Sequence, residues 1–275
     1  MTRTLALGCV ALFAVTAVVG PWVAPFDPRS IDLSHEFEGP SLTHWLGTAE
    51  NGVDILSVLL HGARLAGTVG LLVVGLSVIL GALIGAHAGY RGGLHDQVIT
   101  GLADLVQAVP AIVLNITILA LVARPGVEHL VFALVFPGWV LYARLARAQT
   151  FVLREQEFVE AARALGASDG RIVLRHILPN LAGPMLVQAT TGFGAVILAE
   201  AALSFLGIGP GTGTSWGALL DQGAHVLLRF PHVALLSGAA IFFTVLGFNL
   251  AGDHLRDLLD PRTARRRRRL PNRHA

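Results

Sequence analysis

The chain of 275 residues is strongly apolar and carries little charge. Apolar residues make up 53% of it, charged residues only 14%, and the mean hydropathy is +0.65. Soluble domains usually contain about 25% charged residues, so this composition excludes an ordinary soluble protein and predicts lipid-facing surface. All 20 cationic side chains are Arg, and without Lys the chain has no P-loop for nucleotide phosphates. The single Cys9 excludes an internal disulfide and a Cys-x-x-Cys metal clip.

Six stretches are long and apolar enough to be membrane-spanning helices. They are expected at residues 5–24, 65–88, 98–122, 127–145, 181–206 and 233–250. The first could be a cleaved signal sequence, but its length and the spans that follow it favour a retained anchor. The fourth is expected to break near Pro137-Gly138. The predicted fold is therefore an all-α polytopic membrane protein with six transmembrane helices.

The predicted spans divide the chain into four regions. These are an anchor at 1–24, an extracytoplasmic segment at 25–63 with one short helix at 52–60, a core at 64–260 and a basic tail at 261–275. The core contains a charged loop at 150–180 and an outer loop, rich in Gly, Pro and Thr, at 207–231. The Arg run of the tail lacks the interleaved aromatic residues of a nucleic-acid-binding face. It therefore favours contact with anionic lipid headgroups, and no nucleic-acid partner is expected.

The distribution of Arg residues predicts the orientation in the membrane. On this map one side of the membrane collects most of the Arg residues, and the other has only four: Arg29, Arg64, Arg124 and Arg229. Cytoplasmic loops are enriched in cationic residues. Both termini and the charged loop are therefore expected in the cytoplasm. The exclusive use of Arg is typical of a GC-rich bacterial source, for which the inner membrane is the expected location. Six spans place both termini on one side, which agrees with the charge distribution.

The charged loop contains two short predicted helices. In the first, apolar residues recur at helical spacing and charged residues can occupy the other side: Phe158, Ala161, Ala162 and Leu165 against Glu157, Glu160 and Arg163. Gly166 is expected to end this helix in a left-handed conformation, and Ser168 or Asp169 to cap the second. The second helix, near 172–177, should stop before Pro179. Such a pair makes a compact knob that can insert into a groove of a partner.

The residues of this loop resemble a known family. Glu160-Ala161-Ala162, Gly166 and Leu178-Pro179 look like the EAA loop, or coupling helix, of ABC importer permeases. Further blocks are similar to the second ("C" type) permease of dipeptide, oligopeptide and nickel importers: 44–48, 62–64, 199–207, 215–217 and 248–261. The chain departs from the family pattern at His176, where Ile is usual, and at Val53, where Arg is expected.

The resemblance implies a type I importer permease fold and a transport subunit that is not an enzyme. The implied partners are a homologous second permease, two ATP-binding cassette subunits or domains that hydrolyse ATP, and an extracytoplasmic substrate-binding protein. The residues implied in coupling to the ATPase are Glu160, Ala161, Ala162, Leu165, Gly166, Ser168, Leu178 and Pro179. Di- or oligopeptides are the expected cargo, with nickel, a nickel chelate or haem as the alternatives.

Polar residues inside the predicted spans are candidates for lining the pathway. They include Asn115, Gln188 and Glu200, although for the first two a hydrogen bond to a neighbouring helix is the favoured role. No metal site or cofactor is predicted, because the His residues form neither a His-Glu-x-x-His motif nor a convergent ligand set. A secondary transporter is less favoured, since no inverted repeat with embedded ion ligands is evident.

Overall fold

The computed structural model describes residues 2–211 and 214–259, so the predicted basic tail at 261–275 lies outside the described residues. Within the described part, the regular structure is helical apart from one isolated bridge between Thr48 and Asp54. The helices are α1 (Thr2–Val23), α2 (Ile55–Arg91), α3 (Gly93–Ala108), α4 (Ala111–Ala120), α5 (Val127–Leu153), α6 (Glu157–Ala164), α7 (Asp169–Ile172), α8 (Leu178–Phe205), α9 (Trp216–His225) and α10 (Pro231–Leu259). Three short turns complete them: η1 (Leu33–His35), η2 (Glu50–Gly52) and η3 (Val173–Ile177).

Five helices in the described residues are long and apolar enough to cross a membrane: α1, α2, α5, α10 and the continuous run Asp169–Phe205 that contains α8. The helices α3 and α4 pass the same test only as a pair, and they are bent by 80° at the break between them. With this pair counted as one broken span, the described residues hold six, as the sequence predicts. The chain is thus a multi-pass, all-α membrane protein.

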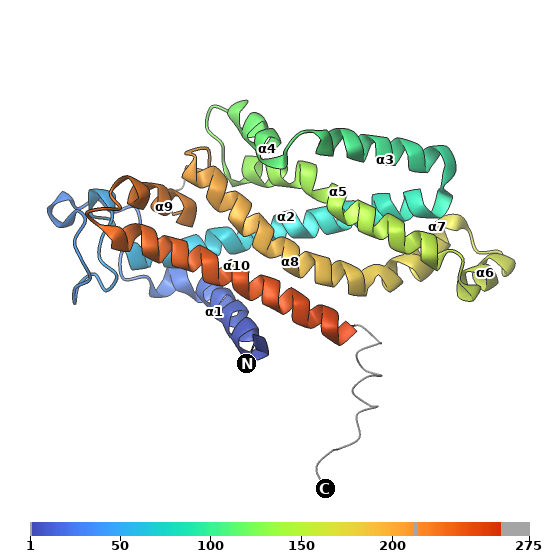
Figure 1. The fold of residues 1–275 in the computed structure, drawn as a ribbon, viewed down its shortest axis with the longest axis horizontal. Coiled ribbons are helices and arrows are strands. Elements are labelled where there is room, and N and C mark those ends of the chain that lie inside the picture. Colours follow the sequence, from blue (N-terminus) through green and yellow to red (C-terminus); the bar gives the residue numbers. More distant parts are fainter. Residues whose placement is uncertain (1, 212–213, 260–275) are drawn as a thin grey trace, which may run out of the picture.

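The long helices define two ends of the molecule (Figure 1). The helices α2, α5, α8 and α10 run along the long axis, and α1 packs against α2 and α10. One end, which we call the α6 end, carries α6 and α7. The opposite end, the α9 end, carries α9 and the residues between α1 and α2. The two longest predicted loops therefore lie at opposite ends of the bundle.

The start of α2 differs from the prediction. The expected short helix at 52–60 is not separate, because it forms the first turns of α2, and the expected boundary at residue 63 falls inside that helix. The Asp54 side chain sets this start, since its carboxylate accepts a hydrogen bond from the Ser57 backbone N–H at 2.8 Å. Such an N-cap satisfies a backbone donor that would otherwise lack a partner.

Three prolines affect the helices around them in two ways: one lies at a bend, and two lie where the helical backbone continues. Pro110 lies at the 80° bend between α3 and α4, within the expected continuous span at 98–122. Pro137 lies inside α5, which does not break there, so the predicted break is wrong. The predicted stop before Pro179 is also wrong, because the π-helical turn η3 leads the chain directly into α8. Local 3₁₀ and π adjustments and packed neighbours allow such prolines inside membrane helices.

The closest helix pair, α2 and α5, packs along a stripe of glycines spaced four residues apart. A Cβ atom added at Gly85 would lie 2.1 Å from the backbone oxygen of Ala143. One added at Gly89 would lie 2.7 Å from the backbone oxygen of Arg147, and Gly81 is similarly confined. Small residues at this spacing let two membrane helices bring their backbones into contact. The pair α2–α5 is therefore fixed mainly by backbone contact.

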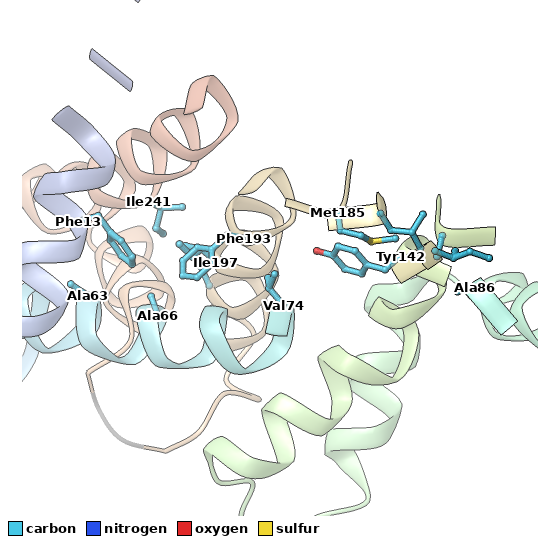
Figure 2. Packing of buried hydrophobic residues seen from close by; sticks show 14 of the residues in the cluster. Phe13, Ala63, Ala66, Val74, Ala86, Tyr142, Met185, Phe193, Ile197 and Ile241 are labelled. Carbon is cyan, nitrogen blue, oxygen red and sulfur yellow. The ribbon is translucent and has the colours of Figure 1, made fainter. Parts of the chain in front are cut away.

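Aromatic side chains join the remaining long helices at a second centre (Figure 2). The ring of Phe193 on α8 stacks on that of Phe248 on α10, with centroids 4.4 Å apart. Phe13 of α1 meets both rings edge-on, at 6.1 Å from Phe193 and 5.5 Å from Phe248. Stacked and edge-on geometries are the favourable ones for aromatic pairs. This cluster fixes α1 against α8 and α10.

We expect Gly85→Val to destabilise the protein by about 3 kcal/mol, because the added side chain must push α2 away from the α5 backbone. The same change at Gly101, where an added Cβ meets nothing within 4 Å, should alter stability by less than about 0.5 kcal/mol. Thermal unfolding of the purified protein in detergent measures both variants. Equal unfolding temperatures for the two would contradict the backbone contact.

Candidate coupling site

The first helix of the charged loop, α6, ends as the sequence predicts. Gly166 has a φ of +80°, in the left-handed region. Its N–H donates to the Arg163 carbonyl, and the next N–H, of Ala167, donates to the Ala162 carbonyl, both at 3.0 Å. These two bonds form a Schellman cap, which satisfies carbonyls that the helix itself leaves free. The cap turns the chain sharply from α6 towards α7.

The knob formed by α6 and α7 packs on the bundle through only part of its apolar surface. Val159 and Ala162 are buried and join the main hydrophobic core together with Ile172 of α7. Phe158 and Leu165 remain 40% and 89% exposed, and Ala161 is exposed beside them. We call Phe158, Ala161 and Leu165 the coupling face. It is an apolar surface held on a buried support and left uncovered in this chain.

The predicted coupling residues all lie at the α6 end. Those on the knob are exposed, apart from the buried Ala162: Glu160, Ala161, Leu165, Gly166 and Ser168. Ser168 occupies the N-cap position of α7, although its side chain makes no capping hydrogen bond. Leu178 and Pro179 begin α8, beyond the π-helical turn. The knob and the start of α8 are thus one continuous element.

Tyr90, in the last turn of α2, ties that helix to both parts of the knob. Its hydroxyl donates to Asp169 Oδ1 of α7 at 3.2 Å and accepts from Arg163 Nη2 of α6 at 3.4 Å. The Arg163 guanidinium also lies over the Tyr90 ring, 6.0 Å from its centroid. The hydrogen bond to the Tyr90 hydroxyl raises the pKa of Arg163 above its ordinary value. Tyr90 is not among the residues that the family resemblance implies in coupling.

Arg154, directly after α5, makes a second tie to the same end of α2. Its Nη1 donates to the Gly89 carbonyl at 2.9 Å. The guanidinium also pairs with Glu155 at 2.9 Å and lies 4.6 Å from the centroid of the Phe151 ring. A cation at the carbonyl end of a helix is electrostatically favourable. The chain segment that leads into α6 is therefore attached to α2.

Two ion pairs hold α3 against α5. Arg147 of α5 forms a two-pronged pair with Asp96, in which Nη2 lies 2.6 Å from Oδ2. Arg144 Nη2 lies 2.6 Å from Asp104 Oδ1. Arg–carboxylate pairs of the forked kind fix geometry as well as charge. Two α5 arginines that are expected on the cytoplasmic side therefore form ion pairs with α3 carboxylates.

The three candidates for the pathway lie in different surroundings. Glu200 is only 2% exposed and accepts hydrogen bonds from Ser204 and Ser215, both at 2.8 Å, so it joins α8 to the start of α9. Asn115 is 3% exposed, and its Oδ1 has no hydrogen-bond partner within the described residues. Gln188 lines a cavity of about 640 Å³ that it shares with Gln149 and Arg256.

The α9 end is held by a buried polar cluster. His44 Nδ1 lies 3.0 Å from Asp54 Oδ1, and both residues are buried. The ring of Phe26 stacks on His44 with centroids 4.7 Å apart, so the segment between α1 and α2 is fixed to the α2 N-terminus. Within the described residues, no group of three or more His, Cys, Asp or Glu side chains is placed to hold a metal ion.

We expect Tyr90→Phe to loosen the knob without unfolding the bundle, because the ring stays while both hydroxyl hydrogen bonds are lost. Each such bond contributes about 0.5–1.5 kcal/mol, so loss of the two should accelerate amide exchange in 157–172 about 5- to 150-fold. Hydrogen–deuterium exchange read by mass spectrometry measures this. Tyr142→Phe, the same change inside α5, is the control and should leave the knob unaffected. Unchanged exchange in both variants would show that Tyr90 does not hold the knob.

The chain matches the family described as "Binding-protein-dependent transport system inner membrane component" over residues 77–265. It is 38% identical over 254 residues to the dipeptide transport system permease protein DppC of Alkalihalophilus pseudofirmus, covering 92% of this chain and 83% of that protein. It is 40% identical over 264 residues to the glutathione transport system permease protein GsiD of Shigella dysenteriae, covering 95% and 86%. The matched region includes the coupling face and its attachments to α2 and α5. The chain therefore belongs to the family of inner-membrane permease subunits of binding-protein-dependent ABC importers.

Proposed function

We propose that the chain forms half of the translocation pathway of an ATP-driven importer of short peptides, and that its coupling face docks on an ATP-binding cassette subunit. The observation that carries this proposal is the exposure of Phe158 and Leu165 on a knob whose other side is buried. Burying a fully exposed side chain of this size contributes about 1.5–3 kcal/mol, so Leu165 would supply most of that amount and the partly exposed Phe158 less than half of it. A short helix that presents such anchors is suited to a helix-in-groove interface.

Force from the ATPase would reach the membrane helices through the ties described above. Closure of the two ATPase subunits would displace α6 and α7, and Tyr90 and Arg154 would transmit the displacement to α2. The glycine stripe would then move α2 and α5 as a unit. The chain itself supplies no nucleotide site and, on this proposal, no cofactor.

The same proposal assigns the remaining partners and the orientation. The α6 end faces the cytoplasm, because it carries most of the Arg residues of the described loops, and both termini lie on that side. The α9 end receives the extracytoplasmic substrate-binding protein, and a homologous second permease completes the pathway. Of the three candidate pathway residues, Gln188 has the strongest support, since it lines a cavity.

Short peptides are favoured as cargo over nickel, nickel chelates and haem. The support comes from two relatives of high coverage, which are named for dipeptide transport and for glutathione transport. Dipeptides and glutathione share a peptide backbone with a free carboxylate.

We expect Leu165→Asp to abolish ATP-driven transport, because it places a charge on the most exposed apolar residue of the coupling face. The variant should still insert in the membrane but lose co-purification of the ATPase at least tenfold. Leu42→Asp, which changes another highly exposed leucine at the α9 end, is the control and should retain the ATPase. Full ATPase retention by Leu165→Asp would contradict the docking face. Gly166→Pro gives an independent check, since proline cannot adopt the left-handed cap.

The cargo is tested by uptake into proteoliposomes that contain the purified complex. We expect ATP-dependent accumulation of a labelled dipeptide, competed by excess unlabelled dipeptide or by glutathione and unaffected by nickel. Omission of ATP is the control for leak. Accumulation of nickel without uptake of any peptide would contradict the assignment while leaving the coupling proposal intact.

A further inference from the structure

A long apolar groove runs along α1, apart from the coupling site and the pathway candidates. Its volume is about 750 Å³, and its walls come from α1, α2, α8 and α10. Phe13, Val74 and Phe193, whose side chains Figure 2 shows on three of these helices, form its floor. Val18 and Leu71 line its edges and are exposed. The groove is therefore open on the outer surface of this chain.

One cation lies in this groove. Arg64 of α2 lines it, is exposed, and makes no ion pair within the described residues. Its guanidinium lies 5.5 Å from the centroid of the Trp22 ring, at the end of α1. Tryptophan and arginine at the ends of spans are typical of the headgroup level of a bilayer. The groove thus has a charged, aromatic end and an apolar remainder.

The length of the groove matches one leaflet of a bilayer. From Arg64 to Val78 the groove follows α2 for 14 residues, or about 21 Å at a rise of about 1.5 Å per residue. One leaflet is about 20–22 Å thick when its headgroup region is included. A molecule with an anion at the headgroup level and a chain that reaches the bilayer centre would therefore fit it along its whole length.

We propose that this groove binds one phospholipid, with its phosphate on Arg64 and an acyl chain between α1 and α2. The guanidinium presents several donors in a planar fork that suits phosphate oxygens. A helix of a second protein would bury Arg64 in an apolar groove unless it carried an acidic residue at that level. Every phospholipid carries the required anion, and charge complementarity therefore favours the lipid as occupant.

The test is native mass spectrometry of the assembled transporter, titrated with phosphatidylglycerol in mild detergent. Arg64→Gln removes the phosphate contact and should weaken the tightest lipid binding about tenfold, since a charge-assisted hydrogen bond is lost. Gly75→Leu fills the groove, where an added Cβ meets nothing within 4 Å, and should reduce binding as strongly. The controls are Arg124→Gln, which removes another exposed arginine, and Gly101→Leu, which adds the same side chain on α3.

The outcomes separate the lipid from a protein occupant. A photo-crosslinking residue in place of Val18 should capture a phospholipid in the assembled complex. Equal lipid binding by all four variants and the unchanged protein would overturn the proposal. Capture of the second permease at position 18 would also overturn it, because the groove would then be a subunit interface. If Arg64→Gln does not assemble, Gly75→Leu still decides the matter, because it leaves the charge in place.

Discussion

The backbone contact between α2 and α5 is the constraint on which the rest of the structure depends. At Gly81, Gly85 and Gly89 the two helices approach so closely that an added Cβ would lie within 3 Å of α5 backbone atoms, so a relative shift of the helices would cause clashes. At the end of this stripe, Arg154 donates a hydrogen bond to the Gly89 carbonyl. The next residue, Tyr90, forms hydrogen bonds with both short helices of the knob. The coupling face is therefore mounted on a rigid pair of spans rather than on a flexible loop. A loop without these ties would absorb a displacement instead of transmitting it.

Much of this fold could be predicted from the sequence, because lipid imposes a simple rule on it. A span must be about 20 apolar residues long and must satisfy its own backbone, so length and hydropathy locate the spans. Whether a proline inside a span bends the helix could not be predicted from the sequence. Pro110 and Pro137 both interrupt apolar runs, yet α5 continues through Pro137 along the glycine stripe of α2. The pair α3–α4 has far less such support and is bent at Pro110.

The coupling site also has features that the sequence predicts and features that it does not. The Gly166 cap follows from local chemistry, since only glycine adopts that conformation without strain. The side of α6 that is buried depends on contacts distant in sequence, so spacing alone could not separate the buried Ala162 from the exposed Leu165. The role of Tyr90 was also hidden, because its partner Asp169 lies 79 residues away. Glu200 is a pathway candidate because it is charged within a span, but its hydrogen bonds from Ser204 and Ser215 could not be predicted from the sequence.

The central claim is that the knob and the α2–α5 pair move together when ATP binds. It is tested most directly by measuring the distance between two spin labels with pulsed electron–electron double resonance. The labels are placed at the exposed positions 164 on α6 and 80 on α2, in a Cys9→Ala background. The measurement compares nucleotide-free and ATP-trapped transporter in a preparation where ATP moves the two permeases relative to each other. The account predicts the same single distance in both states. A distance that shifts or broadens with ATP would show that the knob moves independently and would contradict the account.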